Sequence, residues 1–197
     1  MLEVGCGEGQ LARALARAGH SVTGIDPQAP EGPIFRRTRI EEFSDPGLFD
    51  HVVAILSLHH VEDFGRTLAK MADLLRVGGT LVVVEFALDR IDEATARWAL
   101  DSLPAAASSE GHSWLDRFCR GERGAAEWDE RGFHGSRRMR NELGRRFAER
   151  HFEWVPYLYP ELVEGVSEAD ELAAIESGMI NATGFRYVGT GRALAEP

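Results

Sequence analysis

The stretch that decides the fold is "MLEVGCGEGQLARAL", residues 1–15. It begins with the short apolar run 2–4, continues with glycines at every second position from 5 to 9, and then changes to helical spacing over 10–18. In this last segment, the predicted buried face consists of Leu11, Ala14, Leu15 and Ala18. Glycines let the backbone turn tightly and approach a ligand at a helix N-terminus. The sequence therefore predicts a strand, a ligand-binding turn and a helix at the beginning of the chain.

The same alternation of apolar runs and helical patterns continues through the first half of the chain. Near-continuous runs of valine, isoleucine and leucine between amphipathic helices are typical of a parallel sheet that is covered on both faces. We therefore expect an α/β, doubly wound, Rossmann-like fold with a mostly parallel sheet. Further strands are predicted over 21–26, within 33–43, and over 50–58 and 80–87. A second helix is predicted over 64–75, with Leu68, Met71, Leu74 and Leu75 on its buried face.

The pattern changes after residue 90. Residues 91–150 are irregular and mostly helical, and they predict a helical cap inserted before the last strands. Two final strands, over 151–160 and 185–194, flank a helix over 168–180 and are expected to form an antiparallel C-terminal edge. The prediction is a single domain, 1–197, with a cofactor-binding half (1–90), a cap (91–150) and C-terminal strands (151–197).

Charge argues against a polyanionic partner. The formal net charge is −10, and affinity for nucleic acid comes largely from lysine and arginine. A basic exception is "SRRMRNELGRR", residues 136–146, in which Met139 and Leu143 lie at four-residue spacing with Phe147. This spacing predicts a helix with one solvated basic face. The alternative is a patch that attracts an acidic substrate.

The chain has no feature of a membrane or an exported protein. It contains no run of 18 or more apolar residues and no leader-like apolar stretch behind a basic segment. Its two cysteines, Cys6 and Cys119, are too few for a disulfide framework. We therefore predict a cytoplasmic protein.

Acidic residues in the first two predicted strands limit the chemical class of the ligand. Asp26 ends the run 21–26, where a carboxylate can accept hydrogen bonds from ribose hydroxyls, or can merely cap the following turn. The glycine spacing is G-x-G-x-G, one residue shorter than the dinucleotide pattern, and Glu3 precedes the first glycine by two residues. An early acid suits a cationic group such as an α-amino group better than a pyrophosphate.

Three segments, in order, resemble motifs of the class I S-adenosylmethionine-dependent methyltransferases that act on small molecules. They are "LEVGCGEG" (2–9), "FDHVVAILSLHHVED" (49–63) and "LLRVGGTLVVVEF" (74–86). The resemblance is close over 2–90 and looser over 150–195. It implies S-adenosylmethionine as cofactor and methyl transfer to a small-molecule acceptor, on oxygen, nitrogen or carbon, by direct displacement.

The resemblance also implies roles for individual residues. Glu3 and the glycine turn would line the methionine part, Asp26 would hold the ribose, and Ser57 with Leu58 would border the sulfonium. Arg39 lies where the family often has an acid that meets the adenine, so Ile40 would make a backbone contact and Glu41 is the alternative acid. The implied cofactor-binding residues are Glu3, Gly5, Cys6, Gly7, Gly9, Asp26, Pro27, Ile40, Glu41, Ser57 and Leu58.

Candidates for a general base follow the fourth strand. His59 and His60 stand at its cofactor-facing end, and histidine is a residue type that often serves as a general base, although histidines at such a position can also be structural. Glu85 has a similar claim at the end of the fifth strand. A base is optional, because only a hydroxyl or protonated amine acceptor needs one. No histidine has a recognised metal-ligand spacing, and we predict no metal.

Two other function classes compete with a methyltransferase. One is a non-catalytic or truncated binding module with the methyltransferase fold, and the other is a nicotinamide-dependent dehydrogenase, which the glycine spacing disfavours. Family members carry helical segments before the first strand, whereas this sequence begins at Met1 within it. We therefore expect the chain to lack an N-terminal lid.

Overall fold

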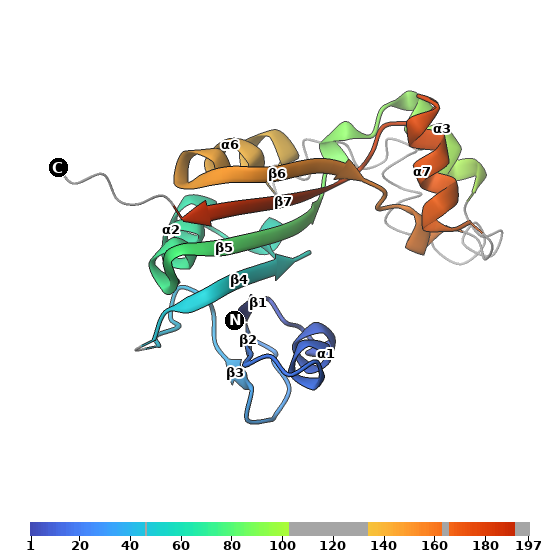
Figure 1. Cartoon of the computed structure of the whole chain (residues 1–197). Helices are drawn as coiled ribbons and strands as arrows, with labels where there is room; N and C mark the ends of the chain where they lie inside the picture. The colour runs from blue at the N-terminus through green and yellow to red at the C-terminus, as the bar shows by residue number, and fades with distance from the viewer. Residues whose placement is uncertain (46, 103–133, 163–165, 192–197) are drawn as a thin grey trace. The chain divides into compact units, whose positions relative to one another are not determined.

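The fold is given by a computed structural model, which describes residues 1–45, 47–102, 134–162 and 166–191. Within these residues, seven strands form one sheet in the order β3-β2-β1-β4-β5-β7-β6 (Figure 1). The strands are β1 (Leu2–Val4), β2 (Thr23–Asp26), β3 (Phe35–Arg37), β4 (Phe49–Ile55), β5 (Leu75–Phe86), β6 (Phe147–Val155) and β7 (Gly184–Gly191).

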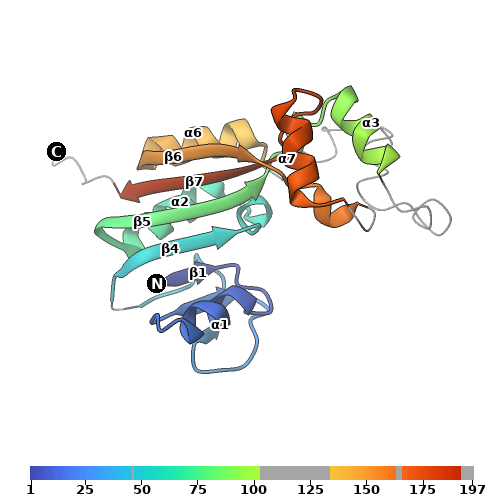
Figure 2. The same ribbon diagram turned by 45° about the vertical axis from the view of Figure 1, so that its right-hand side comes forward.

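Helices connect most of these strands. The α-helices are α1 (Gln10–Arg17), α2 (Phe64–Leu74), α3 (Glu93–Asp101), α6 (Ser136–Arg146) and α7 (Glu168–Glu176). The short 3-10 helices are η1 (Leu58–His60), η2 (Leu88–Arg90) and η4 (Tyr159–Glu161). Helix α1 lies on one face of the sheet, and helices α2 and α6 lie on the opposite face (Figure 2).

The strand directions confirm the predicted fold class. The pairs β1–β2, β1–β4, β2–β3 and β4–β5 are all parallel. Strand β7 runs opposite to β4 and β5, and it pairs with β6 at the edge of the sheet (Figure 1). The strand order reverses between β1 and β4. In open α/β sheets, ligands bind outside the carboxyl ends of the strands at such a reversal.

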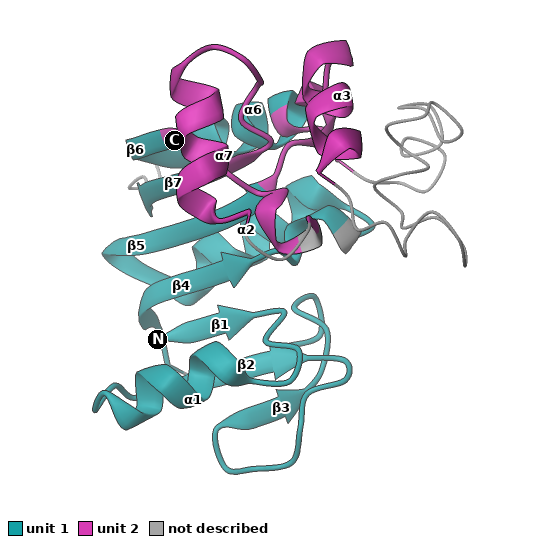
Figure 3. Cartoon of the chain, turned by 90° about the vertical axis from the view of Figure 1, so that its right-hand side faces the viewer, with its two compact units in different colours: residues 1–85, 137–152, 186–197 teal, residues 86–136, 153–185 magenta. Residues whose placement is uncertain are grey.

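The chain divides into two compact units, which we describe separately (Figure 3). Unit 1 consists of residues 1–85, 137–152 and 186–197, and unit 2 of residues 86–136 and 153–185. Helix α6 belongs to unit 1, although it falls within the range 91–150 assigned to the cap. Of that range, residues 103–133 lie outside the described residues. The single domain with an inserted cap stays a prediction.

The core of unit 1 follows the predicted helix faces in α2 and α6. Phe64, Leu68 and Met71 of α2 are fully buried, as are Met139 and Leu143 of α6. The two predicted helices, over 64–75 and 136–146, are therefore confirmed. Large side chains at helical spacing gave a reliable indication of the buried face, because they carry most of the apolar area.

The predicted buried face of α1 is wrong in part. The sequence favoured Ala14 and Ala18 as inward-facing residues, but both are exposed, and Ala12 is fully buried instead. Leu15 does pack against the core cluster, as expected. Alanine carries little apolar area, so its spacing determines the face of a helix weakly.

Some strand boundaries differ from the predictions. Strand β5 begins at Leu75, five residues before the predicted start at residue 80, because Leu75 pairs with Phe49 beyond a register shift. Strand β6 begins at Phe147, within the range predicted as cap. The predicted final strand extends to residue 194, and residues 192–194 lie outside the described part of the chain.

Unit 2 contains a polar network around the start of α3. Asp92 caps this helix by accepting from the Thr95 amide and hydroxyl, at 2.8 and 2.7 Å, and from the Asn181 side chain at 2.9 Å. The hydrogen bonds from the Thr95 hydroxyl and amide hold the pKa of Asp92 below its usual value. Asn181 also donates to the Arg90 carbonyl. Residues distant in sequence, 90–95 and 181, are thus linked within this unit.

Candidate functional site

The glycine turn between β1 and α1 is anchored on the end of β2. The amides of Gly5 and Cys6 donate to the Ile25 carbonyl at 2.8 and 3.0 Å. The Gly7 amide donates to Oδ2 of Asp26 at 3.1 Å. The turn and the acid that the sequence predicted as parts of one site therefore lie in direct contact.

Two glycines of this turn have different surroundings. Both have positive φ, +73° at Gly5 and +47° at Gly7. A Cβ on Gly5 would lie 2.2 Å from Cβ of Ser57, whereas a Cβ on Gly7 would have no atom within 4 Å. Gly5 is therefore required for the close approach of two loops, and Gly7 leaves open space beside the turn.

Gly9 and Cys6 pack beneath the turn. A Cβ on Gly9 would lie 2.3 Å from the Phe35 ring. Cys6 belongs to a buried cluster, and burial raises the pKa of its thiol to about 11. The thiol is therefore neutral at physiological pH and serves as a small packing group. The other buried members of this cluster are Ala12, Val22, Ala29 and Phe35.

Glu3 is a buried acid with an unmatched oxygen. It lies on β1 with 5% of its surface exposed, and among the described residues its Oε2 has no hydrogen-bond partner. Desolvation raises its pKa above the usual value, and a hydrogen bond from the Ala12 backbone acts in the opposite direction. A buried carboxylate oxygen without a partner is costly. A cationic ligand group beside Glu3 would remove that cost.

Asp26 connects the glycine turn to the loop after β2. Its Oδ1 accepts from the Gln28 amide at 2.7 Å, and its Oδ2 accepts from Gly7. A carboxylate has about four acceptor sites, so both oxygens retain capacity for a ligand hydroxyl. Pro27 follows and is exposed.

The segment after β3 is tied to α2. Glu41 accepts a hydrogen bond from the Thr67 hydroxyl at 2.7 Å, and the Ile40 side chain is buried. Arg39 forms an exposed ion pair with Glu62 at 3.3 Å. The carboxylate of Glu41 therefore holds this segment against α2, which weakens its case as the acid that meets an adenine.

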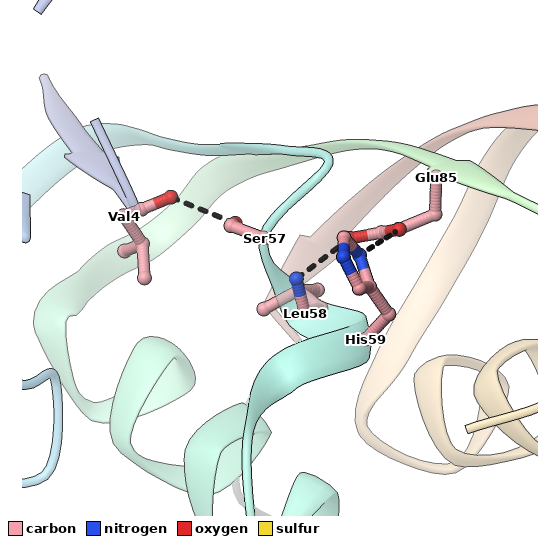
Figure 4. Close-up of polar contacts among 5 residues, drawn as sticks. All are labelled: Val4, Ser57, Leu58, His59 and Glu85. Carbon is pink, nitrogen blue, oxygen red and sulfur yellow. Dashed lines mark hydrogen bonds and ion pairs between the residues drawn. The ribbon is translucent and has the colours of Figure 1, made fainter. Parts of the chain in front are cut away.

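The turn after β4 is held by the ends of β1 and β5 (Figure 4). Ser57 donates through Oγ to the Val4 carbonyl at 2.9 Å. The Leu58 amide donates to Oε1 of Glu85 at 2.6 Å, and Nδ1 of His59 lies 2.9 Å from Oε2 of the same carboxylate. Glu85 is fully buried. Both of its oxygens are engaged within the fold, which argues against the role of a general base.

A comparison with known families now adds to this geometry. A family model described as a methyltransferase domain matches residues 1–156. The chain belongs to this family. The resemblance seen in the sequence motifs is thereby confirmed.

Curated relatives and a solved structure agree with the family. An uncharacterized methyltransferase of Mycobacterium tuberculosis is 37% identical over 102 residues, which cover 44% of this chain and 50% of the relative. The ubiquinone biosynthesis O-methyltransferase of Rhodopseudomonas palustris is 32% identical over 142 residues, with 66% of this chain and 51% of the relative covered. The chain thus spans about half the length of the curated relatives that it matches.

The structural comparison supports the fold. The N-methyltransferase NodS from Bradyrhizobium japonicum, solved with S-adenosylhomocysteine, has a TM-score of 0.52 and 19% sequence identity. The match covers 98% of this chain and 77% of NodS. At this identity the likeness establishes the shared architecture.

In this methyltransferase domain, two of the predicted site residues, Leu58 and His59, have buried side chains. The Leu58 side chain is fully buried, so only its backbone can border a ligand. His59 is 7% exposed and is held by Glu85. The side chain of His60 lies outside the described part of the structure. The sequence also does not predict the left-handed backbone of Leu56, which has a φ of +50°. This residue is 41% exposed.

Metal binding and membrane insertion have no support in the described residues. Within them, no three His, Cys, Asp or Glu residues are grouped so that they could hold a metal ion. In the same part of the chain, every helix is too short or too polar to cross a membrane. The predicted absence of a metal stays a prediction.

Proposed function

We propose that this chain binds S-adenosylmethionine and transfers its methyl group to a small-molecule acceptor. The observation that carries the proposal is the buried, unmatched Oε2 of Glu3 beside a glycine turn at the reversal of strand order. The α-amino group of the cofactor is cationic and would supply the missing partner. Membership of the methyltransferase domain family supports the same ligand.

The residues present fit the rest of the cofactor. The open space at Gly7 would admit the methionine part, and Asp26 would accept from the ribose hydroxyls. The Ile40 backbone would meet the adenine, since its side chain is buried and the neighbouring Glu41 is engaged with Thr67. When bound, S-adenosylmethionine supplies a methyl group that its sulfonium already activates. The protein's task is therefore alignment and exclusion of water.

The acceptor is proposed only as a class. The Rhodopseudomonas palustris relative is named as an O-methyltransferase of ubiquinone biosynthesis, and NodS is named as an N-methyltransferase. Both oxygen and nitrogen acceptors are therefore compatible with this fold. The net charge of −10 favours an acceptor other than nucleic acid.

His59 and His60 stay the candidate bases for an acceptor that must lose a proton. The bond between His59 Nδ1 and Glu85 supports an oriented imidazole at position 59. We assign to Glu85 the role of holding the His59 ring and the Leu58 amide in place.

The test of the proposed function is a binding measurement with a variant of Asp26. Asp26→Ala should raise the dissociation constant for S-adenosylhomocysteine by about 10- to 100-fold, because charged hydrogen bonds to the ribose are lost. Isothermal titration calorimetry measures this change. Asp50→Ala is the control, since Asp50 is an exposed acid paired with Arg76 near the amino end of β4.

Two outcomes would contradict the proposal. Equal affinity in wild type and Asp26→Ala would place the ribose elsewhere. If the wild-type protein binds NAD and does not bind S-adenosylhomocysteine, the result would favour a dehydrogenase.

Glu3→Gln should separate folding from ligand binding. Because the pKa of Glu3 is raised in the fold, the folded state holds the proton more tightly than the unfolded chain. The free energy of unfolding therefore decreases as the pH rises from the pKa of Glu3 in the unfolded chain to its higher pKa in the fold, and the decrease persists at neutral pH. The neutral glutamine should raise the melting temperature of the ligand-free protein at pH 7 and weaken S-adenosylhomocysteine binding by about 10-fold or more.

Thermal unfolding from pH 4 to 8 and calorimetry at pH 7 provide the measurements. Glu8→Gln is the control, because Glu8 lies in the same turn and is exposed. A Glu3→Gln variant that is less stable than wild type at pH 7, or that binds the ligand equally well, would contradict this prediction.

A further inference from the structure

Helix α6, on the face of the sheet opposite to α1, presents an arginine face that the proposed function does not use (Figure 2). Its apolar side chains, Met139 and Leu143, are fully buried, whereas Arg137, Arg138 and Arg145 are exposed. Residues four and eight positions apart lie within about 80° of one another around a helix. Arg137 and Arg145 therefore share one face, and Arg138 lies at its border.

The charge of this arginine face is only partly balanced within the chain. Arg145 pairs with Glu142, one turn earlier on the same helix. In the described part of the chain, Arg137 and Arg138 form no ion pair. Three arginines against one glutamate leave the face positively charged, in a chain whose formal net charge is −10. A local patch of the opposite sign favours a partner surface that is acidic.

Helix α7 presents acidic residues with the same spacing. Glu168, Leu172 and Glu176 are exposed and follow one another at four-residue intervals. The two glutamates are eight positions apart, as are Arg137 and Arg145, so each pair of charges spans about 12 Å along its helix. Leu172 is 40% exposed and gives the acidic face an apolar centre, which is typical of protein interfaces.

The chain itself therefore carries both halves of a complementary contact, and both are exposed. Nucleic acid fits the arginine face less well, because the rest of the chain would repel it. A lipid bilayer also fits less well, because the apolar side chains of α6 are buried in the core and none is left to insert. A second copy of the chain supplies the acidic face at the matching spacing.

We propose that the arginine face of α6 in one copy docks on the acidic face of α7 in a second copy of this chain. The contact joins two exposed helix faces, which bury less area than a permanent interface needs. It is therefore a weak, salt-dependent self-association. It needs no ligand, so it stands or falls separately from the proposed function.

The first test is sedimentation equilibrium of the ligand-free wild-type protein. At about 0.05 M salt the average mass should rise above that of the monomer as the protein concentration increases. At about 1 M salt, where charges are screened within about 3 Å, it should return to the monomer mass.

Charge reversal tests which faces meet. Arg137→Glu with Arg145→Glu, and separately Glu168→Arg with Glu176→Arg, should each raise the dissociation constant for self-association by about 10-fold or more. The variant with all four substitutions should recover the wild-type value, because both faces then carry exchanged charges. All four side chains are exposed, so the melting temperatures should change little.

Net charge provides a built-in control. The substitutions on α7 make the chain less acidic, so general repulsion would predict stronger association, whereas the proposed contact predicts weaker association. Arg13→Glu with Arg17→Glu on α1 has the four-residue spacing of a helix face and changes the net charge as much as the α6 variant. It should weaken self-association less than the α6 variant does.

Three results would overturn the inference. One is a wild-type protein that stays a monomer at low salt at every concentration. Another is self-association that persists in the α7 variant, since the arginine face would then bind a different surface. The third is a folded variant with all four substitutions that associates no better than the two double variants.

Discussion

Gly5→Ala is expected to destabilise the protein by roughly 2–5 kcal/mol, the sum of left-handed strain and overpacking. The new methyl group would lie 2.2 Å from Cβ and 2.8 Å from Oγ of Ser57. Ser57 cannot move away without cost, because its Oγ is bonded to the Val4 carbonyl. Urea denaturation of the ligand-free protein measures the change.

Gly7→Ala is the matched control for this prediction. Its φ of +47° is left-handed like that of Gly5, but no atom lies within 4 Å of the new Cβ. The control should therefore lose only about 1–2 kcal/mol from strain. It should nevertheless weaken S-adenosylhomocysteine binding, since the methyl group would occupy space proposed for the ligand.

A double variant provides a second check. Adding Ser57→Gly to Gly5→Ala removes the atoms that clash, so it should recover part of the lost stability. If Gly5→Ala is no less stable than Gly7→Ala, the two loops do not approach as closely as the structure shows.

The order of the elements could be predicted from the sequence because each leaves a periodic signal. Strand β1, the glycine turn and α1 were recognised from one short stretch, and Asp26 was placed correctly at the end of β2. The antiparallel edge was predicted from two late strands that follow a helical region. These features depend on local spacing and on general rules for connecting strands.

The local geometry of the turn after β4 could not be predicted in this way. Leu58, which the resemblance places beside the cofactor, begins η1 with its side chain in the core, so only its backbone could make that contact. A sequence shows where an apolar run ends, but it does not show how the backbone turns there. Leu56 illustrates the same limit, because leucine is not a residue that signals a left-handed conformation.

Buried polar partners were also beyond sequence reasoning. Glu85 was identified at a strand end as a possible base, whereas the structure pairs its carboxylate with Leu58 and His59. These contacts join residues that are 26 and 27 positions apart in the chain. Only the register of β4 against β5 brings them together.

Glu85→Ala is expected to cost about 3–5 kcal/mol of stability, the range for breaking a buried polar pair by removing one partner. The Leu58 amide and Nδ1 of His59 would both lose their bonds to this carboxylate in a buried environment. Glu85→Gln should cost less, since its amide keeps the shape, can accept from Leu58 and can donate to a neutral His59. Chemical denaturation of the three proteins gives the comparison.

Amide hydrogen exchange tests the cause of this loss. The Leu58 amide should exchange faster than in wild type in Glu85→Ala and stay protected in Glu85→Gln. Glu62→Ala is the control: Glu62 is an exposed acid in an exposed pair with Arg39, and its removal should change stability by less than about 1 kcal/mol. If Glu85→Ala is as stable as this control, the carboxylate does not hold the turn. If it is destabilised as expected, the turn that carries Leu56 and Ser57 depends on a residue of β5 that no ligand needs to touch.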